Sequence, residues 1–252
     1  MLPLMETFYS IQGEGRRAGY NSLFIRFGGC NFKCAGFGVP YTTPDGEQKF
    51  GCDSFYSVDQ KFKKEWDIKD NYIDIVKECD KSIPAKASKY DVVITGGEPL
   101  IYWNTTEFQN LLVYYISRGH KVTIETNASL DIEFTKDYQK QIQFSMSVKL
   151  ENSGEAKHKR INIDSITNIL ENTEQSYLKF VVAKKNSDGT MNEIREILDS
   201  LAYYADVYLM PLGDTNEVLN ENRVAVAELC IEHNFMYSDR MHIAIWGNQM
   251  GV

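Results

Sequence analysis

Three cysteines in the first fifth of the chain have the type and spacing of metal ligands. Cys30 and Cys34 are separated by three residues, and Cys52 follows after a further seventeen. Thiolates are soft ligands that suit iron–sulfur clusters, zinc or copper(I). No fourth cysteine or histidine lies nearby in the sequence, so three thiolates would leave one iron of a cubane cluster open, whereas a structural zinc site normally has four protein ligands. The spacing favours an iron–sulfur cluster; a zinc site completed from elsewhere, or three unpaired loop cysteines, are the alternatives.

The other two cysteines, Cys79 and Cys230, have a different setting. Each lies in a stretch of helical spacing beside apolar residues. Free cysteine in such a setting behaves as a small apolar side chain. We therefore predict that both are core residues.

The composition is that of a globular protein and narrows the range of partners. The chain has 252 residues, of which 43% are hydrophobic and 25% charged, and a formal net charge of -8. This charge argues against nucleic acid or an anionic membrane as the main partner, because both are polyanions. The first nine residues lack a signal-peptide pattern, and no apolar run approaches the ~20 residues of a membrane span. We expect a cytoplasmic protein, in which clustered cysteines more often bind metal than form disulfides.

Short apolar segments alternate with longer segments of helical spacing along most of the chain. The apolar segments predict strands over residues 21–27, 91–95, 121–126, 142–148, 177–183, 206–210 and, last, 241–246. The longer segments predict helices over residues 57–79 (interrupted near 67), 105–118, 131–139, 163–172, 192–204 and 216–234, and residues 35–51 indicate a loop or irregular hairpin. Such alternation is typical of parallel βαβ units in one sheet. The predicted fold is α/β, a partial, open parallel barrel of about six strands, in a single domain over residues 1–252 with a cluster-binding loop insertion at about 30–56.

The most unusual residues of the sequence directly follow the predicted strands. In folds of this class, ligands bind at the carboxyl ends of the strands. Five of these ends carry Gly28-Gly29-Cys30, Thr95-Gly96-Gly97-Glu98-Pro99, Glu125-Thr126-Asn127, Ser147-Val148-Lys149 and Met210-Pro211-Leu212-Gly213. Because these ends would face one mouth of the barrel, we predict one large site there.

The cysteine triplet, together with the segment Thr95-Gly96-Gly97-Glu98-Pro99, resembles the radical S-adenosylmethionine (SAM) superfamily. In that superfamily the open iron is chelated by the amino and carboxylate groups of SAM. Glycines after a strand let backbone carbonyls approach the SAM amine, and Glu98 would add a charge-assisted hydrogen bond to it. The resemblance implies a 4Fe-4S cluster and SAM as cofactors.

Further segments narrow the resemblance to the 7-carboxy-7-deazaguanine synthases of queuosine biosynthesis, a tRNA modification pathway. These segments are Ser10-Ile11-Gln12-Gly13-Glu14-Gly15, Phe24-Ile25-Arg26-Phe27-Gly28-Gly29-Cys30, Cys52-Asp53-Ser54 and Glu125-Thr126-Asn127. The resemblance implies a carbon–nitrogen lyase that converts 6-carboxy-5,6,7,8-tetrahydropterin to 7-carboxy-7-deazaguanine with loss of ammonia, through a 5′-deoxyadenosyl radical. It also implies a homodimer and an electron donor such as flavodoxin or ferredoxin.

The resemblance implies a role for each matching residue. Cys30, Cys34 and Cys52 would ligate the cluster, and Ser54, where the family has threonine, would ligate Mg²⁺. SAM would be bound by Asp53, Gly97, Glu98, Ser147, Val148, Lys149, Met210, Pro211, Leu212 and Gly213. The pterin would be bound by Ile11, Gln12, Gly13, Glu14, Arg26, Thr95, His242 and Val252.

The residue types suit several of these roles. A guanidinium such as that of Arg26 matches a carboxylate bidentately. Gln12 and Glu14 can pair with the donor edge of a guanine-like ring, and the Ser54 hydroxyl is the hard oxygen that Mg²⁺ prefers. Simpler interpretations exist: Arg26 could pair locally, and Gly13-Glu14-Gly15 could be a turn with a solvated carboxylate.

The sequence departs from the family at three places. In the superfamily two residues usually separate the third cysteine from the second; that position is Phe37 in this chain, so the third thiolate would come from Cys52. Gly51 replaces the aromatic residue that usually precedes the last cysteine, so Phe37 or Phe50 would pack near the SAM adenine. The family's chain end reaches the substrate through its terminal carboxylate, and here that role falls to Val252.

Two other functions are weighed against the synthase. An activase that makes a glycyl radical on a protein partner belongs to the same superfamily but has no use for a pterin or magnesium site, so Gln12, Glu14 and Ser54 favour the synthase. A non-catalytic module with structural zinc would need a fourth ligand and leaves the segment 95–99 unexplained.

Overall fold

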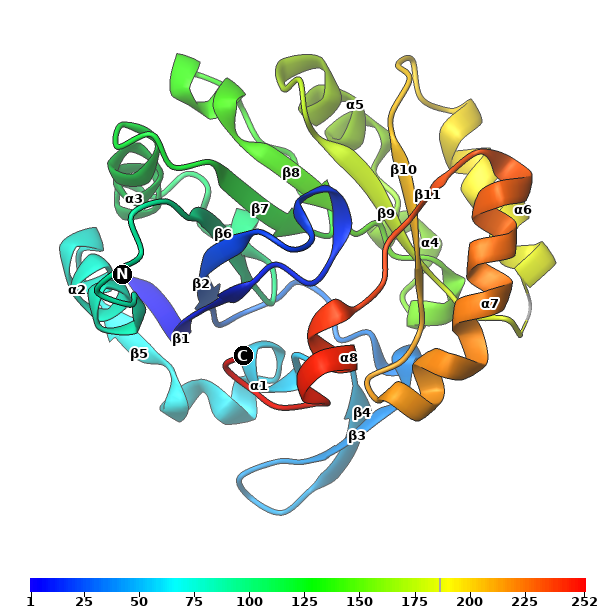
Figure 1. Ribbon diagram of the computed structural model, residues 1–252, viewed down its shortest axis with the longest axis horizontal. Coiled ribbons are helices and arrows are strands. Elements are labelled where there is room, and N and C mark those ends of the chain that lie inside the picture. The colour runs from blue at the N-terminus through cyan, green and yellow to red at the C-terminus, as the bar shows by residue number, and fades with distance from the viewer. Residues whose placement is uncertain (186) are drawn as a thin grey trace.

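An open, curved β-sheet forms the centre of the molecule in the computed structural model, which describes residues 1–185 and 187–252 (Figure 1). Across these residues the strands run in the order β11-β10-β9-β8-β7-β6-β2-β1-β5. Six neighbours of four to seven residues are parallel: β2 (Asn21–Phe27), β6 (Asp91–Gly96), β7 (Val122–Thr126), β8 (Gln143–Met146), β9 (Tyr177–Val182) and β10 (Val207–Pro211). The two-residue edge strand β11 is parallel to β10. Because β11 and β5 stand at opposite ends of this order, the barrel is open. The predicted α/β fold is confirmed.

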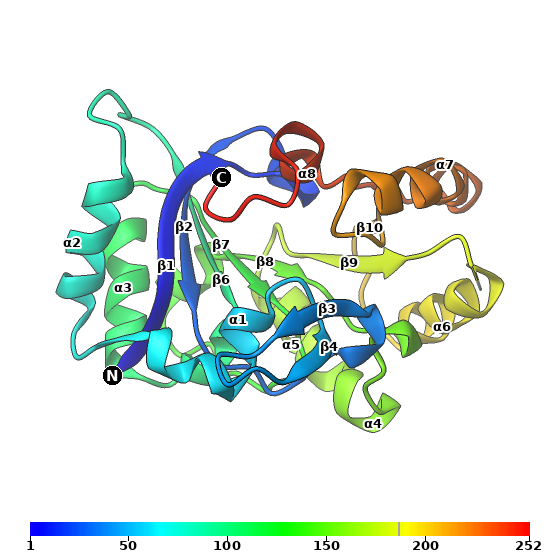
Figure 2. The same cartoon turned by 90° about the horizontal axis from the view of Figure 1, so that it is seen from below.

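Helices cover the outer face of this sheet (Figures 1 and 2). The long ones are α2 (Tyr72–Ser82), α3 (Thr106–Ile116), α5 (Ile163–Asn172), α6 (Ser187–Asp199) and α7 (Asn216–His233), and α1 (Phe55–Val58) and α4 (Lys157–Arg160) have one turn. Their apolar faces and the strands form one core, in which Trp103, Phe108, Phe144 and Phe180 are fully buried. Strands covered on both faces lose the polar alternation of half-exposed strands. Among the helices of the described residues, none is both long and apolar enough to span a membrane.

Three strands at the edges of the sheet are absent from the sequence-based prediction. β1 (Leu2–Ile11) pairs antiparallel with β2, β5 (Asp67–Lys69) pairs antiparallel with β1, and β11 (Met236–Tyr237) extends the other edge. β1 contains a proline and a glutamate and buries only part of its length, which weakens its apolar pattern. β5 and β11 have three and two residues, too few for any pattern.

Four predicted elements are wrong in type or position. Within the helix predicted over 57–79, residues 60–65 form a 3-10 helix and residues 67–69 the strand β5, and α2 begins only at Tyr72. Residues 241–246, predicted as a strand, form the helix α8 (Met241–Trp246), in which only Ile243 is buried. A short apolar run fits a strand and a helix equally, and here the sheet edge is already taken by β11. Residues 131–139, predicted as a helix, are irregular until a 3-10 helix at Asp137–Gln141. The helix predicted over 192–204 begins and ends earlier, as α6.

The segment between Cys34 and Cys52 folds as a small hairpin on the side of the barrel mouth (Figure 2). β3 (Val39–Thr42) and β4 (Gln48–Gly51) pair antiparallel, as the predicted irregular hairpin requires. The ring of Tyr41 stacks on that of Phe55 in α1, with centroids 4.4 Å apart. This packing attaches the hairpin to the body and fixes the backbone from which Cys52 projects.

Candidate functional site

The carboxyl ends of the parallel strands surround a cavity of about 340 Å³, a size that suits small ligands. All of the predicted site residues line it except Glu98 and Val148. The residues in the lining come mainly from β1, the parallel strands and the loops after them, the hairpin insertion and the chain end. Segments far apart in the sequence thus meet at the carboxyl ends of the strands, where the sequence predicted one large site.

The three clustered cysteines face this cavity together. Cys34 is buried, and Cys30 and Cys52 are half-buried. Burial raises the pKa of the Cys52 thiol to about 12, and it raises the pKa values of Cys30 and Cys34 as well. Thiols that resist ionisation in this way need a metal to hold them as thiolates. As predicted, Cys79 and Cys230 lie elsewhere, in the core.

The chemistry of the donor set and the shape of the backbone fit an iron–sulfur cluster better than one metal ion. Within residues 1–185 and 187–252, no three side chains of His, Cys, Asp or Glu converge closely enough to bind a single ion. A cubane makes no such demand, because each thiolate binds a different iron. Beside Cys30, a β-carbon on Gly97 would lie 2.2 Å from the carbonyl oxygen of Gly29 and 2.8 Å from the β-carbon of Cys30. Only glycine lets these two loops approach so closely.

Glu98 holds the glycine-rich turn to β7 and does not line the cavity. Its side chain is buried, and its carboxylate accepts hydrogen bonds from the Leu100 N–H at 2.9 Å, the Thr126 hydroxyl at 2.7 Å and the Asn127 N–H at 2.7 Å. Burial raises the pKa of Glu98, and these hydrogen bonds oppose the rise. The structure thus gives Glu98 three partners within the protein; its contact with SAM stays a prediction.

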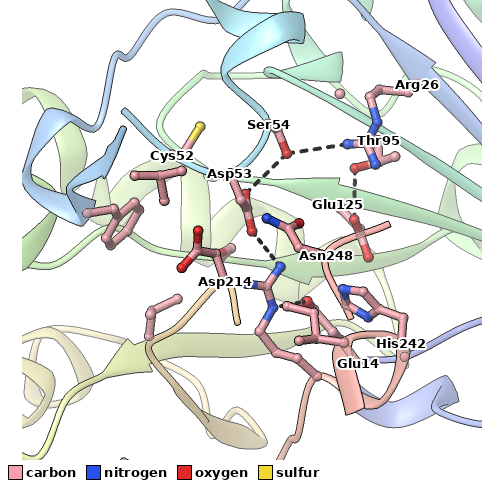
Figure 3. Close-up of a pocket in the computed structure, with 18 of the residues that line it drawn as sticks. Glu14, Arg26, Cys52, Asp53, Ser54, Thr95, Glu125, Asp214, His242 and Asn248 are labelled. Carbon is pink, nitrogen blue, oxygen red and sulfur yellow. Dashed lines mark hydrogen bonds and ion pairs between the residues drawn. The ribbon is translucent and has the colours of Figure 1, made fainter. Parts of the chain in front are cut away.

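Arg26 and Ser54 lie together at one corner of the cavity (Figure 3). The Nη1 of Arg26 is 3.5 Å from the Ser54 hydroxyl, and its Nε donates to Glu6 at 2.7 Å. Burial opposes ionisation of Arg26, but Tyr56 and Glu6 more than offset this, so its pKa is raised. Arg26 is paired locally and still reaches the cavity. Glu6 was not predicted as a site residue because residues 2–11 lack the apolar pattern from which the strand β1 could be predicted.

Glu125 connects two of the predicted pterin-binding residues, Gln12 and Thr95, and Figure 3 shows its contact with Thr95. Its carboxylate accepts a hydrogen bond from the Gln12 amide at 3.2 Å and another from the Thr95 hydroxyl at 2.8 Å. Gln12 also accepts from the Glu14 N–H at 3.1 Å. Glu125 lies near a predicted strand end and in a segment that resembles the family, but no role was predicted for its carboxylate.

A buried chain of ion pairs crosses the floor of the cavity. Glu14 pairs with Lys179 from β9 and with Arg240, whose Nε lies 3.0 Å from its carboxylate. Arg240 also contacts Asp53 and donates to the Gly213 carbonyl at 2.6 Å. Burial would raise the pKa of Glu14, but Lys179 and Arg240 lower it well below its ordinary value. Sequence reasoning missed both cations, although a lysine inside the apolar strand β9 needs a buried partner and so marks a site.

The carboxyl-terminal segment closes one side of the cavity. A β-carbon on Gly13 would lie 2.3 Å from the His242 ring, so the two residues are in close contact. Burial lowers the pKa of His242. The last residues, including Val252, also line the cavity. Of the two aromatic candidates near the adenine, Phe37 lines the cavity, whereas Phe50 is 63% exposed.

Comparison with known proteins agrees with this geometry. The model of the radical SAM superfamily matches residues 24–177. The chain is 32% identical to a 7-carboxy-7-deazaguanine synthase of Rhodopirellula baltica, over 100% of this chain and 89% of that protein. It is 30% identical to one of Halobacterium salinarum, over 98% and 91% respectively. The crystal structure of QueE from Escherichia coli has the same fold, with a TM-score of 0.61 and 22% identity over 96% of this chain and 94% of that one.

Proposed function

The chain belongs to the radical SAM superfamily and, within it, to the 7-carboxy-7-deazaguanine synthases, and from this premise we propose its reaction and the roles of its residues. It converts 6-carboxy-5,6,7,8-tetrahydropterin to 7-carboxy-7-deazaguanine with loss of ammonia. One observation supports this above the others: the three thiols share a single cavity with a set of polar groups, Gln12 and Glu14 among them, that suits a pterin.

Cys30, Cys34 and Cys52 would hold the 4Fe-4S cluster, which would leave one iron without a protein ligand and free to bind SAM. When bound, the cluster and SAM supply the radical that takes a hydrogen atom from the substrate. The backbone around Gly97, the strand ends at Ser147–Lys149 and Met210–Gly213, and the ring of Phe37 would position SAM. Glu98 acts on this site by keeping the glycine turn in place.

The remaining polar groups orient the pterin. Gln12 and Glu14 face the ring edge, and their hydrogen bonds to Glu125, Lys179 and Arg240 fix their directions before the substrate arrives. Such preorganisation reduces the entropy cost of reaching a reactive geometry. Arg26 and Ser54 share a corner, which suits a substrate carboxylate and a Mg²⁺ ion that bind side by side.

The carboxyl-terminal segment also forms part of the pterin site. Gly13 packs against His242, and Val252 lines the cavity. Side chains that displace water there would limit side reactions of a reactive intermediate. The proposal further includes a homodimer, cytoplasmic location and an external one-electron donor.

Anaerobic purification with iron and sulfide analysis, followed by incubation with dithionite, SAM, Mg²⁺ and the carboxy-tetrahydropterin, tests the reaction. We expect a brown protein that forms 7-carboxy-7-deazaguanine. A brown protein that cleaves SAM but leaves the pterin unchanged would contradict the synthase and favour the activase. A colourless zinc protein would contradict both.

A further inference from the structure

The segment that follows β8 packs against the loop that carries Cys30 and Cys34. A β-carbon on Gly36 would lie 2.5 Å from the carbonyl oxygen of Asn152 and 2.6 Å from the amide nitrogen of Gly154, so the two backbones touch. Cys34 itself has a left-handed conformation, with φ of 51°, which residues other than glycine seldom adopt. The segment after β8 therefore helps to hold the conformation of the loop that carries Cys30 and Cys34.

One side chain of this segment binds the loop directly. Glu155 accepts two hydrogen bonds with its Oε1, from the Lys33 N–H at 2.7 Å and from the Cys34 N–H at 2.9 Å. Arg160, which is 4% exposed, donates to the backbone carbonyls of Glu155 and of Lys149, each at 3.0 Å. Arg160 is in turn paired with Glu193. Arg160 thus holds the backbone of Glu155, while the Glu155 carboxylate binds the N–H groups of Lys33 and Cys34.

We propose that Glu155 is a positioning residue that fixes the Cys34 end of the loop and lowers the reduction potential of the cluster bound there. This inference rests on the proposed function only in so far as Cys34 ligates the cluster.

Glu155 would lower the reduction potential of the cluster through two effects. Reduction adds one electron and no proton to a group that already has three thiolate ligands, so a nearby carboxylate disfavours the reduced state. Hydrogen bonds to cluster sulfurs are one determinant of the potential, because they stabilise the more negative, reduced state. The N–H groups of Lys33 and Cys34 are already bound to Glu155, so they do not donate to sulfur.

A redox titration of the anaerobically reconstituted protein, followed by electron paramagnetic resonance in the absence of SAM and pterin, tests the inference. In Glu155→Gln the amide oxygen still accepts both N–H bonds, so the iron content and thermal midpoint should stay at wild-type values. The potential should rise. At the wild-type midpoint, the ratio of reduced to oxidised cluster should increase on the order of tenfold, about 59 mV for one electron.

Two further variants separate charge from structure. Glu155→Asp keeps the charge and should keep a potential near wild type. Glu151→Gln removes an exposed carboxylate four residues earlier, where solvent screens it, and should leave the potential unchanged.

An unchanged potential in Glu155→Gln would overturn the inference, as would an equal shift in Glu151→Gln. If Glu155→Gln takes up less iron, the redox titration still tests the inference, because the electron paramagnetic resonance signal comes only from assembled clusters. A wild-type protein that binds no cluster would instead contradict the proposed function.

Discussion

Arg240, from the turn before α8, donates a hydrogen bond to the carboxylate of Asp53, 187 residues earlier in the chain. Asp53 stands between Cys52 and Ser54, so this contact joins the chain end to the loop of the proposed cluster and magnesium ligands. The same guanidinium contacts Glu14, on the proposed pterin side. Arg240 thus links the two halves of the site.

Replacement of Arg240 should therefore affect folding and both ligands. Arg240→Ala removes a partner from Glu14 and from Asp53, which are both half-buried, and should cost on the order of 1–3 kcal/mol of unfolding free energy. Arg240→Lys should recover part of this loss but not the contact with both carboxylates, because an ammonium lacks the planar fork. Urea unfolding measures the stability, and equilibrium dialysis measures the SAM and pterin dissociation constants. The control is Lys157→Ala, which breaks a pair that is more than 60% exposed on both sides and should leave the unfolding free energy near the wild-type value.

The pKa of Glu14 gives the stability of the protein a defined pH dependence. Its folded-state pKa lies below its ordinary value of 4.5, because Lys179 and Arg240 outweigh the effect of burial. Below pH 4.5 the unfolded chain binds a proton that the folded chain does not, so Glu14 stabilises the fold above this pH and the contribution is lost as the pH falls. Lys179→Met should raise the pKa of Glu14 and so reduce the difference in unfolding free energy between pH 7 and pH 3.5.

Urea unfolding of the cluster-free protein at the two pH values measures this difference. Glu14→Gln should reduce it as well, and the double variant should show no further reduction. If the difference in unfolding free energy between the two pH values stays at the wild-type size in Lys179→Met, Lys179 is not what lowers the pKa of Glu14.

The cluster should depend on Gly97 for a steric reason. In Gly97→Ala the added β-carbon meets the Gly29 carbonyl oxygen at 2.2 Å, and this contact cannot be relieved without moving the backbone next to Cys30. We expect iron uptake to fall several-fold. Gly119→Ala is the control: its β-carbon meets nothing within 4 Å, and its positive φ of 81° should cost only about 1 kcal/mol without loss of iron. Equal iron content in both variants would show that cluster uptake does not require the close approach of Gly97 to the Gly29 backbone.

The sequence predicted the six parallel strands well because buried strands leave a continuous apolar pattern, as in β6 and β9. It failed at Met241–Trp246, where five apolar residues and one histidine fit either period and the neighbouring β11 decided the outcome. Site residues at strand ends were predictable from topology. Lys179 and Arg240 were not, because their importance lies in partners that only the folded chain brings together.

The proposed magnesium ligand should be separable from the cluster. Ser54→Ala removes a hydroxyl that lies 3.5 Å from Arg26 and 3.3 Å from Asp53, while the cysteine loop is untouched. Because Mg²⁺ requires hard oxygen ligands, the concentration of Mg²⁺ for half-maximal turnover of the pterin should rise about tenfold or more, and Ser54→Thr should restore it. Cleavage of SAM without pterin, measured as 5′-deoxyadenosine, should remain at the wild-type rate. A fall in SAM cleavage that matches the fall in turnover would place the hydroxyl in cluster or SAM binding instead.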